Sequence, residues 1–233
     1  MKMIKILFSA LVILTGMQVK AQTADEVIDK YVEAMGGKEK LAALKSVKMS
    51  GSMSVQGTDI TLTITKAHMT GMRVDMEIMG SSNYQVANTK EGWVFMPVMG
   101  MGSPQQMDED QFKSAASQFD VQGALFNAKE KGNTVEMVGK EKVDGAEAYN
   151  MKVTYQNGKT GNFFIDTKTN RLIKTSSKTT VQGQEMDMET SFSDYKQNTD
   201  GYWFAYTTTN MQGTITFDKI ESNVKVDEAI FKN

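Results

Sequence analysis

Side chains that could act as a nucleophile or a base are scarce in this chain. His68 is the single histidine and there is no cysteine, which leaves almost no nucleophile–base pair. Most acidic residues fall on the polar phase of alternating segments, which indicates a solvated surface. The sequence does not exclude two carboxylates that face each other in a cleft, as in a glycosidase. The stretches MGMG and MGGK lack the spacing of phosphate-binding loops. We therefore expect no enzyme activity, no cofactor and no metal site, and a solvated or hydrogen-bonded His68.

Methionine is abundant, with 19 in 233 residues. Its unbranched, polarizable side chain suits a cavity that accepts varied apolar ligands, but it also serves as an ordinary core residue. A third interpretation is Cu(I) binding by closely spaced pairs, which are Met69/Met72, Met76/Met79, Met99/Met101 and Met186/Met188. Residues i and i+2 of a strand share a face, so packing alone also predicts the last two spacings.

Arg73 and an apolar run are the other candidates for binding. Arg73 stands beside Met72 in an alternating segment, where its guanidinium could bond carbonyl groups of a lid or of a ligand ester. Its phase, opposite to Val74 and Met76, instead predicts contact with water. The run Trp93–Met96 is apolar on both sides, so one of its faces meets either a helix or a ligand.

Two helical segments position these residues. In Thr23–Val47, Thr23 and Glu26 form a capping box and an apolar stripe follows at helical spacing until Gly36-Gly37. A short second helix contains Leu41 and Leu44. Within the interruption Met99–Lys131, Asp108 and Gln111 predict another helix with Phe112 and Phe119 on its apolar side.

Nearly everything else alternates with period 2 from Ser46 onward, as in Met72–Ile78 and Tyr149–Tyr155. This pattern is typical of antiparallel strands with one dry and one wet face. Turn signals such as Asn157-Gly158 separate ten to twelve strands, which favours an up-and-down meander in one domain.

The first 21 residues form a different kind of segment. Lys2 and Lys5 precede a short apolar run, and Ala21 ends a cleavage pattern, so we expect a secretory signal peptide at 1–21. The absence of cysteine excludes a lipidated N-terminus and disulfides. The formal charge of −2 without a basic run argues against nucleic acid and anionic membrane surfaces.

Several stretches together resemble a known family. They are DEVIDKYVEAMGGKEKLAALKSV, GWVFMP, VEMVGKEKVDG, FFIDTKTNRLIK and DEAIF. With the signal peptide and the helical insertion, the sequence resembles the LolA-like outer-membrane lipoprotein-sorting proteins of Bacteroidetes type over residues 22–233. The resemblance implies an unclosed antiparallel β-barrel of about eleven strands, mainly β with α, whose helices cover a concave face that holds acyl chains. It also implies an inward arginine that locks the lid, for which Arg73 is the counterpart. Related folds serve as sensors and receptors.

We therefore expect a monomeric periplasmic carrier that binds the acyl chains of lipoproteins or lipids, with segments Thr23–Leu44 and Asp108–Phe119 as a movable lid. The alternative is an envelope interaction or sensor module of the same fold with a filled core and a protein partner. The residues expected to line the cavity are Met49, Met53, Leu62, Ile64, Val74, Met76, Ile78, Trp93, Phe95, Phe112, Phe119, Tyr149, Met151, Val153, Met186 and Met188.

Overall fold

The computed structural model describes residues 22–55, 57–181 and 184–233, and the expected signal peptide lies outside them. The described chain is dominated by strands, as the period-2 alternation predicts. The strands are β1 Ser46–Val55, β2 Thr58–Ala67, β3 Gly71–Ile78, β4 Ser81–Asn88, β5 Gly92–Phe95, β6 Gln105–Gln106, β7 Thr134–Val143, β8 Ala146–Thr154, β9 Thr160–Asp166, β10 Leu172–Val181, β11 Gln184–Gln197, β12 Trp203–Asn210 and β13 Gly213–Ser222.

These strands form one antiparallel sheet in the order β6-β5-β4-β3-β2-β1-β13-β12-β11-β10-β9-β8-β7. Two meanders are joined where β1 pairs with β13. The described sheet has 13 strands rather than the expected eleven. One reason is that β6 consists of two exposed glutamines without any alternation. The apolar run Trp93–Met96 lies mostly in β5, which ends at Phe95, and the 3-10 turn η1 (Pro97–Met99) follows it.

The helices begin where the capping residues predict. In α1 (Ala24–Ala34), the Glu26 amide donates to the Thr23 hydroxyl and the Thr23 amide donates to the Glu26 carboxylate. In α3 (Glu109–Ala116), Asp108 and Gln111 form the same reciprocal pair. The short α2 spans Lys38–Ala43, and a 3-10 turn, η2 (Glu228–Phe231), closes the chain. No described helix has the length and apolar character needed to cross a membrane.

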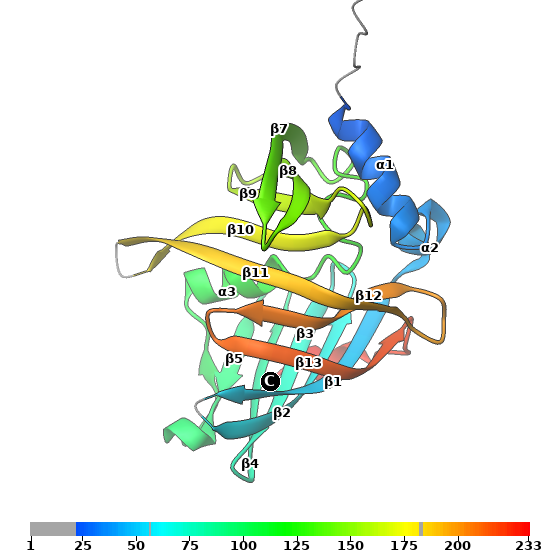
Figure 1. The fold of residues 1–233 in the computed structure, drawn as a ribbon. Helices are drawn as coiled ribbons and strands as arrows, with labels where there is room; N and C mark the ends of the chain where they lie inside the picture. The colour runs from blue at the N-terminus through cyan, green and yellow to red at the C-terminus, as the bar shows by residue number, and fades with distance from the viewer. Residues whose placement is uncertain (1–21, 56, 182–183) are drawn as a thin grey trace, which may run out of the picture.

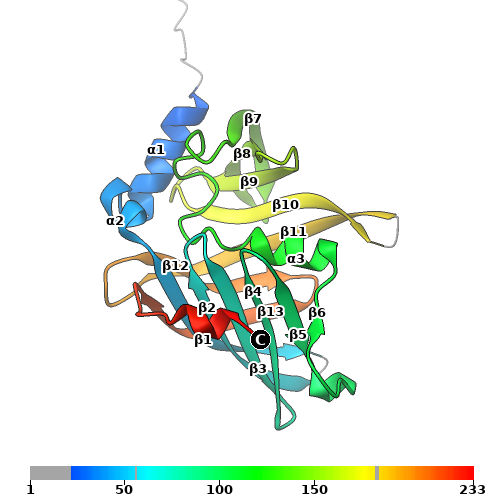
Figure 2. The same cartoon turned by 180° about the vertical axis from the view of Figure 1, so that it is seen from behind.

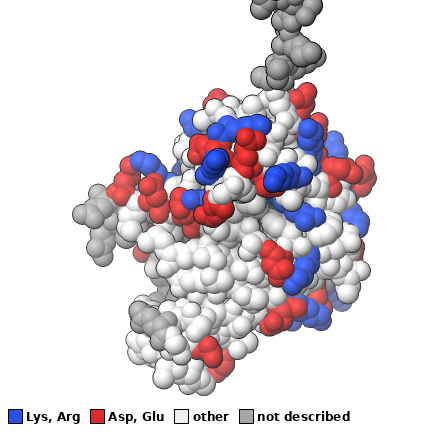
Figure 3. All heavy atoms as spheres, viewed as in Figure 1, with Lys and Arg blue, Asp and Glu red and all other residues white. Residues whose placement is uncertain are grey.

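The sheet curls so that it has an inner and an outer face (Figure 1). Cross-strand partners point to the same side, and the register places Met49, Ile64 and Val74 together on the inner face. The outer face carries serines and threonines, with Thr207, Thr216, Ser52 and Thr61 in one row. Figure 3 shows the broad uncharged surface that results on this side.

The two helical layers lie at different parts of the curled sheet (Figure 2). Helix α1 packs on β7 to β9, α3 packs on β3 and β4, and η2 lies against β3 and β4 on the outer side. A Cβ atom at Gly71 would lie 2.9 Å from the Phe231 ring, which explains why glycine stands where η2 packs. The expected helical cover of the concave face is thus only roughly matched.

The segment 117–133, which we call the crossover, connects α3 to β7. Since β6 and β7 are the two edges of the described sheet, the chain from β6 through α3 and the crossover runs from one edge to the other. Val121 of the crossover packs in the same cluster as Leu62 and Phe204, residues of the inner face. The crossover therefore spans the inside of the curled sheet.

Candidate ligand-binding face

The inner face of the central strands is a continuous apolar surface. Leu62 is 3% exposed, and packed around it are partly exposed side chains that come from β1, β2, β3, β12 and β13. They are Met49, Met53, Ile64, Met76, Phe204, Tyr206 and Ile215. Ile78 pairs with Ile60 and has the same phase as Met76. Large apolar side chains that retain exposure inside a curled sheet leave room for an apolar ligand.

Helix α3 covers the adjoining part of the inner face. Phe112 and Phe119 pack there with Met72 and Val74, and Phe119 is buried. These residues and the central cluster lie on one side of the sheet because Val74 pairs with Ile64. The structure thus brings together nine of the expected residues, which are Met49, Met53, Leu62, Ile64, Val74, Met76, Ile78, Phe112 and Phe119.

Tyr149, Met151 and Val153 lie elsewhere, in the core beneath α1. They pack with Val27 and Tyr31, and both Met151 and Val153 are 0% exposed. Leu125 of the crossover and Ile165 of β9 pack into the same cluster, each at most 2% exposed. These three residues are therefore part of a packed core rather than the wall of an opening.

Trp93 and Phe95 do not lie on the inner face, which corrects their expected placement. Arg73 also lies on the outer face, as its phase predicts, so the inward lock implied by the resemblance is absent at this residue. Arg73 pairs across the sheet with Thr65 and Val86, and Val86 pairs with Trp93. The Arg73 guanidinium bonds Asp75 at 2.8 Å and the carbonyl of Ile230 at 3.4 Å. It stacks 4.6 Å from the centre of the Tyr84 ring. Arg73 thus fastens the C-terminal turn to the outer face, where it reaches neither α1 nor α3.

Phe95 follows the same outer phase, with its ring 5.6 Å from that of Tyr84. The run Trp93–Met96 is apolar at every position, so its sequence does not show which side chains point to the inner face.

The methionine pairs that could bind Cu(I) are not uniformly arranged. Met69 is 60% exposed whereas Met72 is 5% exposed, and Met79 is 81% exposed whereas Met76 is half-buried. Met186 and Met188 share a face of the β10–β11 hairpin and are exposed. Packing requirements account for Met72 and Met76 without a metal.

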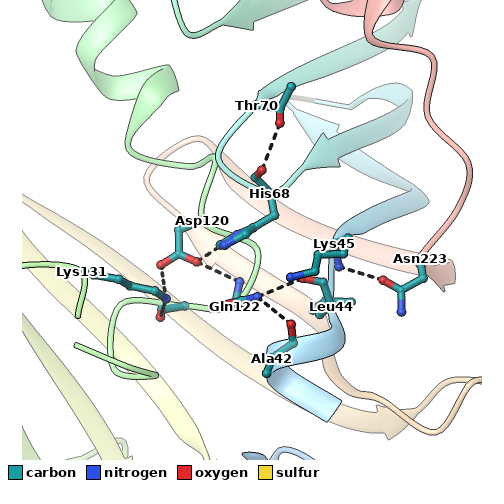
Figure 4. A network of polar contacts seen from close by, with 10 residues as sticks. Ala42, Leu44, Lys45, His68, Thr70, Asp120, Gln122, Lys131 and Asn223 are labelled. Carbon is teal, nitrogen blue, oxygen red and sulfur yellow. Dashed lines mark hydrogen bonds and ion pairs between the residues drawn. The ribbon is translucent and has the colours of Figure 1, made fainter. Parts of the chain in front are cut away.

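Polar contacts hold the crossover in place (Figure 4). The Gln122 amide donates to the carbonyls of Ala42 and Leu44, at 3.3 and 3.2 Å. The amide of Met69 donates to the Phe119 carbonyl at 2.9 Å. His68 Nδ1 lies 3.5 Å from the Asp120 carboxylate, and burial lowers the pKa of His68 despite this neighbour. His68 is thus a partly buried structural contact, and the crossover is tied to α2 and to the β2–β3 turn.

A small cavity remains between the crossover and the inner face. It has a volume of about 140 Å³ and is lined by Leu44, Val121, Tyr202 and Phe204 together with Tyr31 and Met35 of α1. A drug-sized ligand needs a pocket of about 300 Å³ or more. This cavity is an extension of the inner apolar surface under the closed crossover.

Lys66 is a binding candidate that was not singled out from the sequence. It pairs with Val47 and Met72, so it lies on the inner face beside two buried apolar residues. Burial lowers its pKa to about 8. Its phase could have been predicted, because Ile60, Leu62, Ile64 and Lys66 alternate with three threonines.

Solved structures share this architecture. An outer membrane lipoprotein-sorting protein domain from Vibrio parahaemolyticus has a TM-score of 0.55 at 13% identity, covering 90% of this chain and 95% of its own. A LolA superfamily protein from Nitrosomonas europaea has a TM-score of 0.56 at 13% identity, covering 91% of this chain and 99% of its own. The chain has a LolA-like fold.

A DUF1329 family protein from Desulfovibrio piger is also similar, with a TM-score of 0.56 at 13% identity over 91% of this chain and 98% of its own. No protein-family model and no curated protein sequence matches the chain. The mainly β, LolA-like fold expected from the resemblance is confirmed, whereas the number of strands and the helical cover agree only roughly with the expectation. Identities of 13% establish the fold alone.

Proposed function

We propose that this chain is a non-enzymatic periplasmic carrier that binds the acyl chains of lipoproteins or lipids on the inner face of the sheet. The observation that carries this proposal is the half-buried apolar cluster around Leu62 inside a curled sheet. Methionines in that cluster would adapt to chains of different length and branching. The LolA-like fold adds support through its similarity to an outer membrane lipoprotein-sorting domain.

The energy for binding would come from burial of methylene groups, at about 0.8 kcal/mol for each one removed from water. Because the cavity of about 140 Å³ is small, binding requires the crossover and α3 to move away from the inner face. Leu125 and Phe126, each 2% exposed, fix the later part of the crossover in the core. Residues 117–122 are the part that would move, and polar bonds of Gln122, His68 and Phe119 help to hold this part. Breaking such bonds exchanges them for bonds with water at a modest net cost of about 1 kcal/mol each.

The proposal is tested on protein secreted into a bacterial periplasm and purified without detergent. Organic-solvent extraction followed by mass spectrometry should recover acyl-bearing lipids in a fixed ratio to protein. A lipid-free preparation should take up a fluorescent fatty acid. Absence of both extracted lipid and uptake would contradict the proposal.

A second candidate is an envelope interaction or sensor module, favoured by the completely packed core beneath α1, where Met151 and Val153 are 0% exposed. In that case, envelope proteins would bind the helices or the outer face. Charged substitution of Met76 would then leave partner binding intact, whereas under the carrier proposal it removes lipid uptake.

A further inference from the structure

Lys66 has an unusual position for a lysine. The inner positions of β1, β2 and β3 are all described by the structure, and Lys66 is the only one of them that bears a charge. Its neighbours across the sheet, Val47 and Met72, are 3% and 5% exposed. Placing an ammonium group among apolar side chains disfavours folding unless a partner compensates for the lost water.

The partners that the structure provides for Lys66 are weak. Its ammonium lies 3.4 Å from the Gln118 side-chain oxygen, at the limit of a hydrogen bond. Gln118 follows the end of α3 at Ala116, where the negative end of the helix dipole also favours a cation. Lys66 forms no ion pair with a carboxylate in the described part of the chain, and Asp120, two residues after Gln118, is engaged by Lys131 and His68.

Lys66 lies at the border between two apolar clusters of the inner face. Lys66 is two residues beyond Ile64 on the inner face of β2, and Ile64 belongs to the central cluster. On its other side, Met72 belongs to the cluster beneath α3. The ammonium thus lies where the central apolar cluster meets the covering helix. Once the crossover has moved away, an anion bonded there would have its acyl chain over Ile64, Leu62 and Met76.

From this arrangement, we propose that Lys66 binds the anionic head group, a carboxylate or a phosphate, of an acyl ligand held on the inner face. This inference rests on the proposed carrier function and adds a ligand class, namely amphiphiles with one negative head group. A charge-assisted hydrogen bond to a carboxylate or phosphate oxygen would supply the partner that Lys66 lacks. The Lys66 side chain is partly exposed. A neutral amphiphile lying over it would displace water from the ammonium without supplying an anionic partner.

The test compares two fluorescent probes that differ only in charge, dansylaminoundecanoic acid and its methyl ester, at pH 7 with the full chain. We expect the acid to bind at least tenfold more tightly than the ester. Lys66→Met should remove this preference by weakening acid binding, and Lys66→Arg should keep it. Lys48→Met is the matched control, because Lys48 is exposed on the outer face of the adjacent strand.

Equal binding of both probes by the unchanged chain would overturn the role of Lys66 and leave the carrier proposal standing. Failure of both probes to bind would overturn both proposals. Retained preference in Lys66→Met, with its fold verified by circular dichroism, would also overturn the assignment. A lysophosphatidate and a fatty acid, each used to displace the acid probe, distinguish a phosphate head group from a carboxylate.

Discussion

The Asp120 carboxylate accepts a hydrogen bond of 2.6 Å from the Lys131 ammonium, and both side chains are 19% exposed. Lys131 also donates to the Gly123 carbonyl at 2.8 Å. This ion pair joins two positions of the crossover that are eleven residues apart in the chain (Figure 4). Removing one member leaves the other charge partly buried without its partner.

We therefore expect Asp120→Asn to lower the free energy of unfolding by about 2 kcal/mol, because Lys131 then loses its counter-ion. Lys131→Met should lower it by a similar amount, and the double variant by less than the sum. Urea unfolding followed by circular dichroism measures all three. Additive losses would show that the two side chains do not stabilise the crossover together.

Gln122 tests the movement of the crossover. Gln122→Ala removes two hydrogen bonds to α2 and should lower the free energy of unfolding by about 1–2 kcal/mol. The weaker attachment should also speed uptake of a fluorescent fatty acid in stopped-flow measurements. Gln212→Ala, in the exposed β12–β13 turn, is the control. An unchanged uptake rate in Gln122→Ala would mean that the crossover does not open during binding.

His68 makes the crossover sensitive to acid. Burial places the pKa of His68 below its ordinary 6.5, so the unfolded chain binds a proton there more readily than the folded chain. Stability contributed by neutral His68 is present above pH 6.5 and is lost as the pH falls through the lower folded pKa. Between pH 7 and 5, we expect His68→Gln to lose less stability than the unchanged chain. If the free energy of unfolding of the two proteins fell equally between pH 7 and 5, this role of His68 would be contradicted.

Lys66 makes stability depend on pH in the alkaline range. Its pKa of about 8 in the folded chain lies below its ordinary 10.5, so between these values the unfolded chain binds more protons and stability rises with pH. Lys66→Met should therefore be more stable than the unchanged chain at pH 7, by about 1–2 kcal/mol. This advantage should shrink toward pH 10, whereas Lys48→Met shows no such trend. A constant difference across the range would exclude a depressed pKa.

Local signals in the sequence predict much of this architecture. The capping pairs Thr23/Glu26 and Asp108/Gln111 predict where two helices begin, because each pair satisfies amides that a helix start leaves free. Alternation in β2 and β3 predicts the inner face, including Leu62 and Met76. The exposed Gln105–Gln106 strand carries no such pattern, since a sheet edge is determined by its neighbour rather than by its own residues.

The division of the inner face into open and filled parts depends on contacts distant in the chain. Met151 and Met76 look alike in sequence, since both are methionines in alternating strands. Val27 and Tyr31 of α1 fill the space beside Met151, while the space beside Met76 is less completely filled. The resemblance implies an inward Arg73, although its own phase predicts the outer face that the structure shows.

The central claim, an acyl chain held on the inner face, is tested most directly at Met76. Direct binding of a fluorescent fatty acid is measured for Met76→Glu, with Met79→Glu as its matched control, since Met79 is 81% exposed just beyond the same strand. We predict that Met76→Glu weakens binding at least tenfold, because a carboxylate on the inner face would have to be buried against the chain. Met79→Glu should bind as the unchanged protein does. Equal affinity for all three folded proteins would contradict the claim.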